Sequence, residues 1–209
     1  MGTIGYGSMY PATDLANSVV TAESLVSLVV TAVATGLVFA KFGRTTARVV
    51  FARNVVVSQL DGAPTLVVRI GNERHNRILD ASFRVTLVRT ERPAPDVVFY
   101  RMYDLKLARE RTATLERFYT LLHRIDASSP LNGYDTAALA RDEVELHVIV
   151  AGTDDTTLQP VHAIHAYYDR DIRFGSRFAD LLREEPDGTL AADVRKFHEV
   201  VTDPENGVT

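Results

Sequence analysis

The longest apolar stretch of this chain lies near its beginning, from Leu15 to Phe42. Residues 24–40 carry no charge, and Glu23 is the only acidic side chain within the stretch. A helix needs about 20 mainly apolar residues to cross a bilayer. A surface helix of a soluble protein would show a polar face, and residues 24–40 show none. We therefore predict a transmembrane helix. A buried helix or a strand pair in a soluble core, suggested by the many Val and Thr residues, is the alternative.

The charges that flank this stretch indicate its orientation. Asp14 is the only charge on the N-terminal side, whereas Lys41, Arg44, Arg48 and Arg53 follow on the C-terminal side. Basic residues concentrate on the cytoplasmic side of membrane helices. We expect the C-terminal part of the chain to be cytoplasmic and the protein to be integral to a membrane, the inner or plasma membrane if the source is bacterial.

After the helix, short apolar segments alternate with turn signals, which favours a β-sandwich. The hairpin turn Asp61-Gly62 and a short helix from Thr136 to Arg141, capped by Asp135, interrupt the strands. Loops are expected at 91–96 and 126–134, and a turn at 152–157. The predicted extended segments are 49–51, 55–57, 65–70, 83–89, 97–107 (one strand or two), 115–125, 145–150 and 159–168.

These patterns divide the chain into four parts. We expect residues 1–42 to hold the transmembrane helix and the stretch before it, 43–48 a linker, 49–200 the β-sandwich domain and 201–209 a disordered tail. The fold class is mainly β, with one transmembrane α-helix before the sandwich.

Composition narrows the functional classes. The 209 residues include no cysteine, which excludes disulfides and thiolate chemistry. The net charge of −4 argues against a nucleic-acid partner. Residues 1–14 contain no Lys or Arg, so no secretory signal is predicted.

The sequence offers no convincing active site. His162 and His165, three apart on a strand, would point to opposite faces, so one packed and one exposed histidine is expected. Ser128-Ser129 lacks a nucleophile-elbow pattern, and Asp154-Asp155 fits a structural turn. We expect a protein that is not an enzyme and needs no cofactor.

The stretch before the helix carries a specific motif, Thr3-Ile4-Gly5-Tyr6-Gly7. In a T-[VI]-G-Y-G filter, four copies turn backbone carbonyls and the threonine hydroxyl inward to replace the hydration shell of K⁺. Gly5 and Gly7 permit backbone angles that a β-carbon would forbid. The sequence predicts K⁺ coordination by Thr3, Ile4, Gly5 and Tyr6 in a homotetramer, with K⁺ as the permeant ion.

Together with its later segments, the chain resembles the prokaryotic (KirBac-type) inward-rectifier potassium channels. Beyond the filter, the resemblance rests on 36–42, Phe51-Ala52-Arg53, 69–72, Asp104-Leu105, 125–131, 152–157, 163–167 and 172–178. It implies an immunoglobulin-like cytoplasmic domain. The family's outer, slide and pore helices precede the filter and are absent here, so we expect a C-terminal portion of such a channel.

The resemblance also implies roles for individual residues. Thr31, Gly36 and Phe39 are the pore or gate candidates. Phe39 matches the bulky ring at the helix-bundle crossing, although helix packing or lipid contact is the alternative. Thr31 falls where strongly rectifying members carry an acid, so strong polyamine block is not expected.

Two further sets of residues have candidate roles. Glu23 is costly in lipid unless it faces protein or water, which favours support of the filter or pore wall; hydration at the outer interface is the alternative. The small residues along the helix indicate packing against other helices. Lys41, Arg44 and Arg48 are a thinned version of the family's cluster that binds anionic lipid headgroups.

Three hypotheses remain at this stage. The chain is a K⁺ channel subunit whose inner helices gate the pore, or a membrane-anchored binding or regulatory module that does not conduct. The third is a soluble sandwich with a buried helix.

Overall fold

The computed structural model describes residues 10–42, 48–74, 76–94, 96–184 and 188–203. It divides the chain into two compact units, Met1–Thr45 and Thr46–Thr209, which are described separately.

The described part of the first unit is dominated by one helix, α1 (Asp14–Phe42). Thr13 caps its start, because Ala16 N donates to Thr13 Oγ1 at 3.2 Å. The hydroxyls of Ser18 and Thr21 donate to the carbonyls four positions earlier, so these polar groups are satisfied within the helix. At 1.5 Å per residue the 29 residues extend about 43 Å, more than the roughly 30 Å hydrocarbon core.

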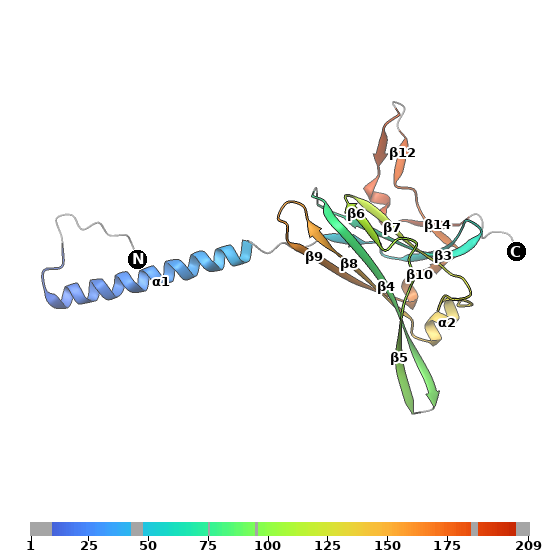
Figure 1. The fold of residues 1–209 in the computed structure, drawn as a ribbon, viewed down its shortest axis with the longest axis horizontal. Helices are drawn as coiled ribbons and strands as arrows, with labels where there is room; N and C mark the ends of the chain where they lie inside the picture. The colour runs from blue at the N-terminus through green and yellow to red at the C-terminus, as the bar shows by residue number, and fades with distance from the viewer. Residues whose placement is uncertain (1–9, 43–47, 75, 95, 185–187, 204–209) are drawn as a thin grey trace. The chain divides into compact units, whose positions relative to one another are not determined.

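The second unit, shown in Figure 1, is mainly β. The helical segments described in it are α2 (Thr136–Arg141) and the 3₁₀ turns η1 (Asp169–Asp171) and η2 (Val194–His198). The described strands are β1 (Val49–Phe51), β2 (Val55–Leu60), β3 (Ala63–Asn72), β4 (Ile78–Ala94), β5 (Val97–Asp104), β6 (Arg111–Leu115), β7 (Phe118–Arg124), β8 (Glu145–Asp154), β9 (Pro160–Tyr168), β10 (Ile172–Phe174), β11 (Ser176–Phe178), β12 (Leu182–Glu184), β13 (Leu190–Ala192) and β14 (Val200–Thr202).

Two five-stranded sheets form the sandwich. In the first sheet β3 pairs with β1 and β2 along one edge and with β7 along the other, and β10 adds to β2 in parallel. In the second sheet the order is β5-β4-β8-β9, and β6 also pairs with β4. Two antiparallel two-stranded pairs, β11 with β14 and β12 with β13, complete the unit.

The larger core cluster lies between the sheets. Alternate residues of β8, Leu146, Val148 and Val150, are fully buried, as the period of two requires. The first sheet is also covered on its other face, where Val56 and Val67 pack with Phe178, Leu181 and Phe197. This second cluster explains why β2 and β3 are almost continuously apolar.

Several sequence predictions are confirmed. The fold is mainly β, with one long apolar helix preceding a β-sandwich. Asp61 and Gly62 both have positive φ and form the two-residue β2–β3 turn. The helix Thr136–Arg141 has the same bounds as predicted, and Asp135 Oδ1 accepts from Ala138 N at 2.7 Å.

The segment predicted as a loop at 91–96 is instead the end of a long hairpin. β4 continues to Ala94 and pairs with β5, with an irregularity between Glu91 and Ala94 that accommodates Pro93. The proline suggested a break, but proline is tolerated at bulges. Of 97–107, only Val97–Asp104 is strand.

Two other boundaries also differ. The segment 115–125 is not continuous, because the chain bends at Glu116 and Arg117 and crosses from β6 in the second sheet to β7 in the first. The turn predicted at 152–157 begins later, since Gly152 and Thr153 pair within β8 and β9.

Residues 201–203, predicted as part of a disordered tail, are ordered in the structure. Val201 and Thr202 belong to β14, and Asp203 is buried, with its Oδ2 accepting from Gln59 N at 3.1 Å. Residues 204–209 lie outside the described residues.

Candidate functional site

The predicted filter, Thr3 to Gly7, lies outside the described residues, and so does Arg44. The K⁺ coordination assigned to Thr3, Ile4, Gly5 and Tyr6 stays a prediction. The remaining candidates lie on α1 and in the β-sandwich unit.

The gate candidates share one side of α1. An ideal helix turns about 100° per residue, which places Phe39 about 80° from Thr31 and about 60° from Gly36. Phe39 lies between the other two around the helix, about 12 Å along the axis from Thr31. Its side chain is 74% exposed in the single chain, and a Cβ at Gly36 would meet no atom within 4 Å. This side of α1 is therefore open for contact with other chains or an aqueous path.

The surface of α1 is unsuited to water. Eleven of its large apolar side chains are exposed by 44–78%. In the described residues α1 is the one helix that meets the length and composition needed to cross a membrane. Glu23 lies on this surface and is exposed, and Lys41 lies in the last turn, where a positive charge stabilises the helix end.

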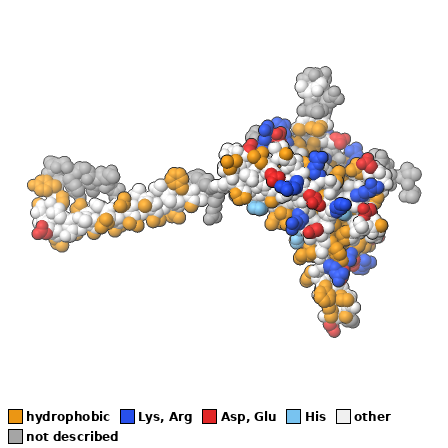
Figure 2. All heavy atoms as spheres, in the orientation of Figure 1, with side chains coloured by type: hydrophobic (Ala, Val, Ile, Leu, Met, Phe, Trp, Pro, Cys, Tyr) orange, Lys and Arg blue, Asp and Glu red, His pale blue; other side chains and the backbone are white. Residues whose placement is uncertain are grey.

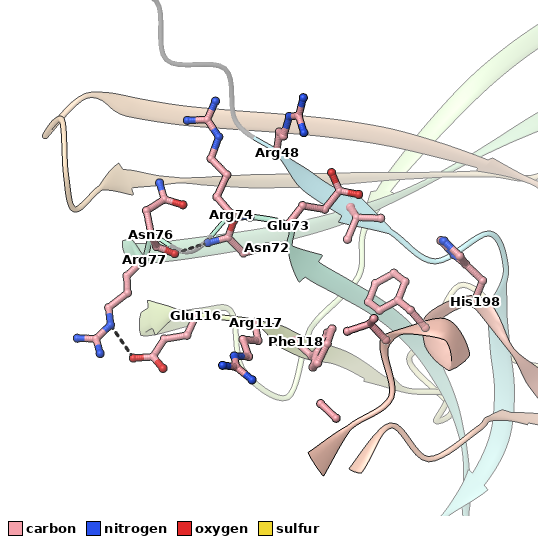
Figure 3. Close-up of a pocket in the computed structure, with 14 residues that line it drawn as sticks. Arg48, Asn72, Glu73, Arg74, Asn76, Arg77, Glu116, Arg117, Phe118 and His198 are labelled. Atoms are coloured by element: carbon pink, nitrogen blue, oxygen red, sulfur yellow. Dashed lines mark hydrogen bonds and ion pairs between the residues drawn. The ribbon is translucent and has the colours of Figure 1, made fainter. Parts of the chain in front are cut away.

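The β-sandwich unit contains a cavity of about 830 Å³ next to its first described residue, Arg48. Figure 3 shows Arg48 and Arg74 on one side of it, with Arg117 and the Arg77–Glu116 ion pair on the other. Four arginines and two glutamates line the cavity, an excess of two positive charges. Such a lining favours an anionic ligand.

Local hydrogen bonds hold the walls of this cavity. Asn72 N donates to Arg117 O at 2.7 Å, which joins the end of β3 to the β6–β7 bend. Asn72 also binds the following loop, where its Nδ2 donates to Asn76 O and its Oδ1 accepts from Arg74 N. Glu73 N donates to Arg48 O at 2.9 Å. The arginines thus project from a backbone that is fixed by neighbouring elements.

The floor of the cavity is apolar and tightly packed. A Cβ at Gly71 would lie 3.0 Å from Val50 Cγ1 and 3.1 Å from Phe197 Cε2. Glycine at this position therefore lets η2 approach β3 closely. The rings of Phe118 and Phe197 lie 5.8 Å apart.

Two polar atoms at the cavity are buried without a hydrogen-bond partner among the described residues, Asn76 Oδ1 and His198 Nδ1. Burial lowers the pKa of His198, and the nearby charge of Arg53 lowers it further, whereas Glu73 opposes this. A lowered pKa favours the neutral form of His198, whose ring can donate from one nitrogen and accept at the other.

A second cavity of about 510 Å³ shares Arg48 and Arg74 with the first and adds the turn after β8. Asp154 organises this turn. Its carboxylate accepts from Thr157 N at 2.8 Å, from Thr156 N and from Asn76 Nδ2. These bonds, led by that of the Thr157 backbone, keep the pKa of Asp154 below its usual value. Asp154 has the structural role expected from the sequence.

The two histidines considered for metal binding lie in different environments. His162 is exposed, whereas the ring of His165 stacks on Phe51 at 5.1 Å and meets Tyr167 edge-on at 4.6 Å. Ser128 donates to Asp126 within its own loop, and Ser129 binds the buried ring of His123 at 2.8 Å. The ring contacts of His165 therefore contribute to packing, and the hydrogen bonds of Ser128 and Ser129 stabilise the loop.

Sequence reasoning found only Arg48 among the cavity residues. The cavity's other arginines and its histidine come from three separate segments, and nothing in their spacing along the sequence links them. They are Arg74 and Arg77 before β4, Arg117 at the β6–β7 bend and His198 in η2. The one available sequence signal was the Gly71-Asn72 pair, which indicates the end of β3 and therefore a chain turn at the cavity.

Comparison with known proteins places the chain in a family. The family described as "Inward rectifier potassium channel C-terminal domain" matches residues 49–208. The chain is 40% identical to the inward rectifier potassium channel Kirbac3.1 of Paramagnetospirillum magnetotacticum over 200 residues, 96% of this chain and 68% of that protein.

Mammalian relatives are more distant. The ATP-sensitive inward rectifier potassium channel 8 of Homo sapiens is 29% identical over 95% of this chain, and channel 12 of Rattus norvegicus is 30% identical over 97%. The chain spans about half the length of each, 49% in both cases. With the matched domain and the Kirbac3.1 similarity, the chain belongs to the inward rectifier potassium channel family.

Proposed function

We propose that this chain is a subunit of a potassium channel in which four copies surround one pore. The observation that carries the proposal is the family match across 49–208, directly after a single long apolar helix and the Thr3–Gly7 motif. Flux is passive, with K⁺ as the permeant ion and no cofactor.

The filter chemistry requires several copies of the chain. One copy of Thr3 to Gly7 supplies one wall, and four walls around an axis replace the water around K⁺ with carbonyl oxygens. The ring is completed only in a homotetramer, which is the partner that the chain needs first.

In this proposal α1 is the inner helix. It crosses the membrane with its C-terminal end, and therefore the β-sandwich unit, on the cytoplasmic side. Thr31 and Phe39 face the pore, Phe39 forms the narrow gate, and Gly36 beside it lets neighbouring helices approach. Glu23 supports the filter from the protein side of the helix, because a charge facing lipid is costly.

The basic cavity gives the subunit a regulatory site for an anionic group. Arg48 belongs both to the cluster Lys41, Arg44 and Arg48 and to the cavity with Arg74 and Arg117. Anionic lipid headgroups are the ligands that such clusters attract. A free phosphate compound is the second candidate, since two mammalian relatives are named ATP-sensitive channels.

The rival proposal is a membrane-anchored module that does not conduct. The two are separated by measuring K⁺ efflux from vesicles that contain the purified chain. The channel proposal expects efflux that Gly5→Ala abolishes and that Thr3→Ser, which keeps the hydroxyl, largely preserves. A chain that stays in the membrane but shows no K⁺ efflux favours the module. A chain that stays in solution without detergent contradicts both.

A further inference from the structure

His198, the last residue of η2, is a titratable group in the lining of the basic cavity. Figure 3 shows its ring rising from η2 on the side of the cavity that carries Arg48 and Glu73. The ring nitrogen Nδ1 is buried and has no hydrogen-bond partner among the described residues. Leaving a buried polar atom unpaired is costly, so this nitrogen favours a ligand that can form a hydrogen bond with it.

The packing of η2 holds this ring in place. The rings of Phe197 and His198 meet edge-on with their centroids 5.1 Å apart, and Phe197 is buried against Phe118 in the second core cluster. The end of η2 is closed by a hydrogen bond of 3.0 Å from Glu199 N to Lys196 O. His198 is therefore held at the cavity, where its charge acts on whatever the cavity binds.

The charged groups around His198 are mainly basic. On the elements packed around it they are Arg48 and Arg53 beside β1, Glu73 and Arg74 after β3, the Arg77–Glu116 pair, Arg117 at the β6–β7 bend and, in η2 and its flanks, the Asp193–Arg195 pair, Lys196 and Glu199. Burial lowers the pKa of His198, Arg53 lowers it further, and Glu73 raises it. Without an anion, these surroundings therefore disfavour the protonated ring.

An anion in the cavity opposes this effect. In the protonated ring both nitrogens carry a hydrogen, so Nδ1 becomes a donor that lacks an acceptor among the described residues. A phosphate oxygen can accept this hydrogen, and its negative charge raises the pKa of a neighbouring imidazole. Protonation of His198 and binding of the anion then strengthen each other to the same degree, because the two equilibria are linked.

We propose that His198 makes this cavity a pH-dependent anion site, in which a phosphate group binds more tightly when the ring is protonated. This inference rests on the anionic ligand proposed above for the cavity. The recognised chemistry is the phosphate group, carried either by a lipid headgroup or by a free compound. If the anion raises the pKa of His198 by about one unit, binding is about fivefold tighter at about pH 5.5 than at about pH 8.

The direct test is the number of protons taken up when the ligand binds. The full chain in uncharged detergent is titrated calorimetrically with dihexanoylphosphatidylglycerol, in pairs of buffers that differ in ionisation heat, between about pH 5.5 and about pH 8. The phosphodiester keeps one negative charge over this range, so any proton taken up goes to the protein. Sodium sulfate at constant ionic strength is the second probe, because it stays doubly charged and has no lipid chain.

Two variants show whether His198 takes up the proton. His198→Asn keeps a polar atom near the position of Nδ1 but does not titrate, whereas His162→Asn removes an exposed histidine on β9. The second variant is needed because acidic and basic side chains are interspersed over the face of the β-sandwich unit in Figure 2, so acidification changes charges outside the cavity as well. We expect proton uptake and about fivefold tighter binding at low pH in the unmodified chain and in His162→Asn, and neither in His198→Asn.

The remaining outcomes are distinguishable. Proton uptake with sulfate as well as lipid supports a site for the phosphate group itself, whereas uptake with the lipid alone supports a headgroup site. Equal affinity at both pH values that Arg48→Ala still weakens refutes the role of His198 and leaves the proposed anion site intact. Proton uptake that persists in His198→Asn also refutes it. Binding of neither probe refutes the anion site, and the role of His198 with it.

Discussion

The guanidinium carbon of Arg69 lies 4.4 Å from the centre of the Phe178 ring, over the outer face of the first sheet. Arg69 Nη2 also donates to Ala179 O at 2.9 Å, and only 9% of the residue is exposed. Burial lowers the pKa of Arg69, and Asp180 partly offsets this. One buried cation thus attaches the C-terminal segment to β3.

Arg69→Met should therefore destabilise the protein. It keeps the apolar stem but loses a hydrogen bond from a charged group, worth about 1.5–3 kcal/mol. The measurement is urea unfolding of the full chain in detergent. Arg111→Met is the control, because Arg111 pairs with Asp80 at an exposed site. Its loss should lower the free energy of unfolding by less than about 1 kcal/mol. Equal losses for the two variants would contradict the role of Arg69.

The hydroxyl of Tyr167 provides a second test. Tyr167 is fully buried and donates to Ala52 O at 2.7 Å. Tyr167→Phe leaves that carbonyl without its partner, which should cost about 1–3 kcal/mol in the free energy of unfolding. Tyr168→Phe, at the exposed next position, should change it by less than about 0.5 kcal/mol. A larger loss for Tyr168→Phe would argue against the bond.

Stability in acid should depend on Asp142. Hydrogen bonds from Arg141, and also from Tyr134, lower the pKa of Asp142 from 3.8 to about 2. Because the folded-state pKa is depressed, this stabilisation is present above about pH 4 and disappears as the pH falls towards 2. Asp142→Asn should flatten the decline in unfolding free energy across this window. Urea unfolding of the full chain across this pH window measures the decline, and an equally steep decline in Asp142→Asn would refute the assignment.

Gly152 should be intolerant of a side chain. A Cβ there would lie 2.5 Å from Ile78 Cγ2 and 2.9 Å from Leu79 O. Gly152→Ala forces β8 and β4 apart and should lower the thermal midpoint, at a cost of about 1–3 kcal/mol. Gly36→Ala, where nothing lies within 4 Å, should leave the unfolding of the β-sandwich unit unchanged. A harmless Gly152→Ala would show that the two strands separate easily.

Arg48→Ala should weaken binding of the full chain to vesicles that contain phosphatidylglycerol. One basic side chain near an anionic surface contributes about 1 kcal/mol, so the expected loss is about fivefold. Flotation of protein with vesicles measures this binding, with Arg111→Ala as the control. Competition by inorganic phosphate would indicate that the cavity accepts free phosphate as well as headgroups. An unchanged affinity for Arg48→Ala would exclude Arg48 from the site.

The elements predicted from sequence were those whose signals are local. The absence of charge in residues 24–40 defines α1, and Asp61-Gly62 and Asp135 define a turn and a cap within a few residues. The 91–96 segment was missed because Pro93 looks like a break in isolation. Its pairing depends on β5, which follows only after the turn, and on a bulge that the sequence does not announce.

The candidate functional residues likewise form two groups, those with a local sequence signal and those that only the fold brings together. Thr3 to Gly7 is a contiguous motif whose chemistry can be read directly, although these residues lie outside the described structure. The cavity joins Arg48, Arg74, Arg117 and His198, which are distant in sequence and meet only through the pairing of β3 with β1 and β7. No periodicity links such residues, so only the fold brings them together.

We propose that this chain lines a potassium-selective pore. The most direct test is the reversal potential of the purified chain in a planar bilayer, with K⁺ on both sides at unequal concentrations and Na⁺ added to balance the total salt. We expect a reversal potential close to the K⁺ equilibrium value and no current from Gly5→Ala. A reversal potential near zero, or a current that survives Gly5→Ala, would contradict it.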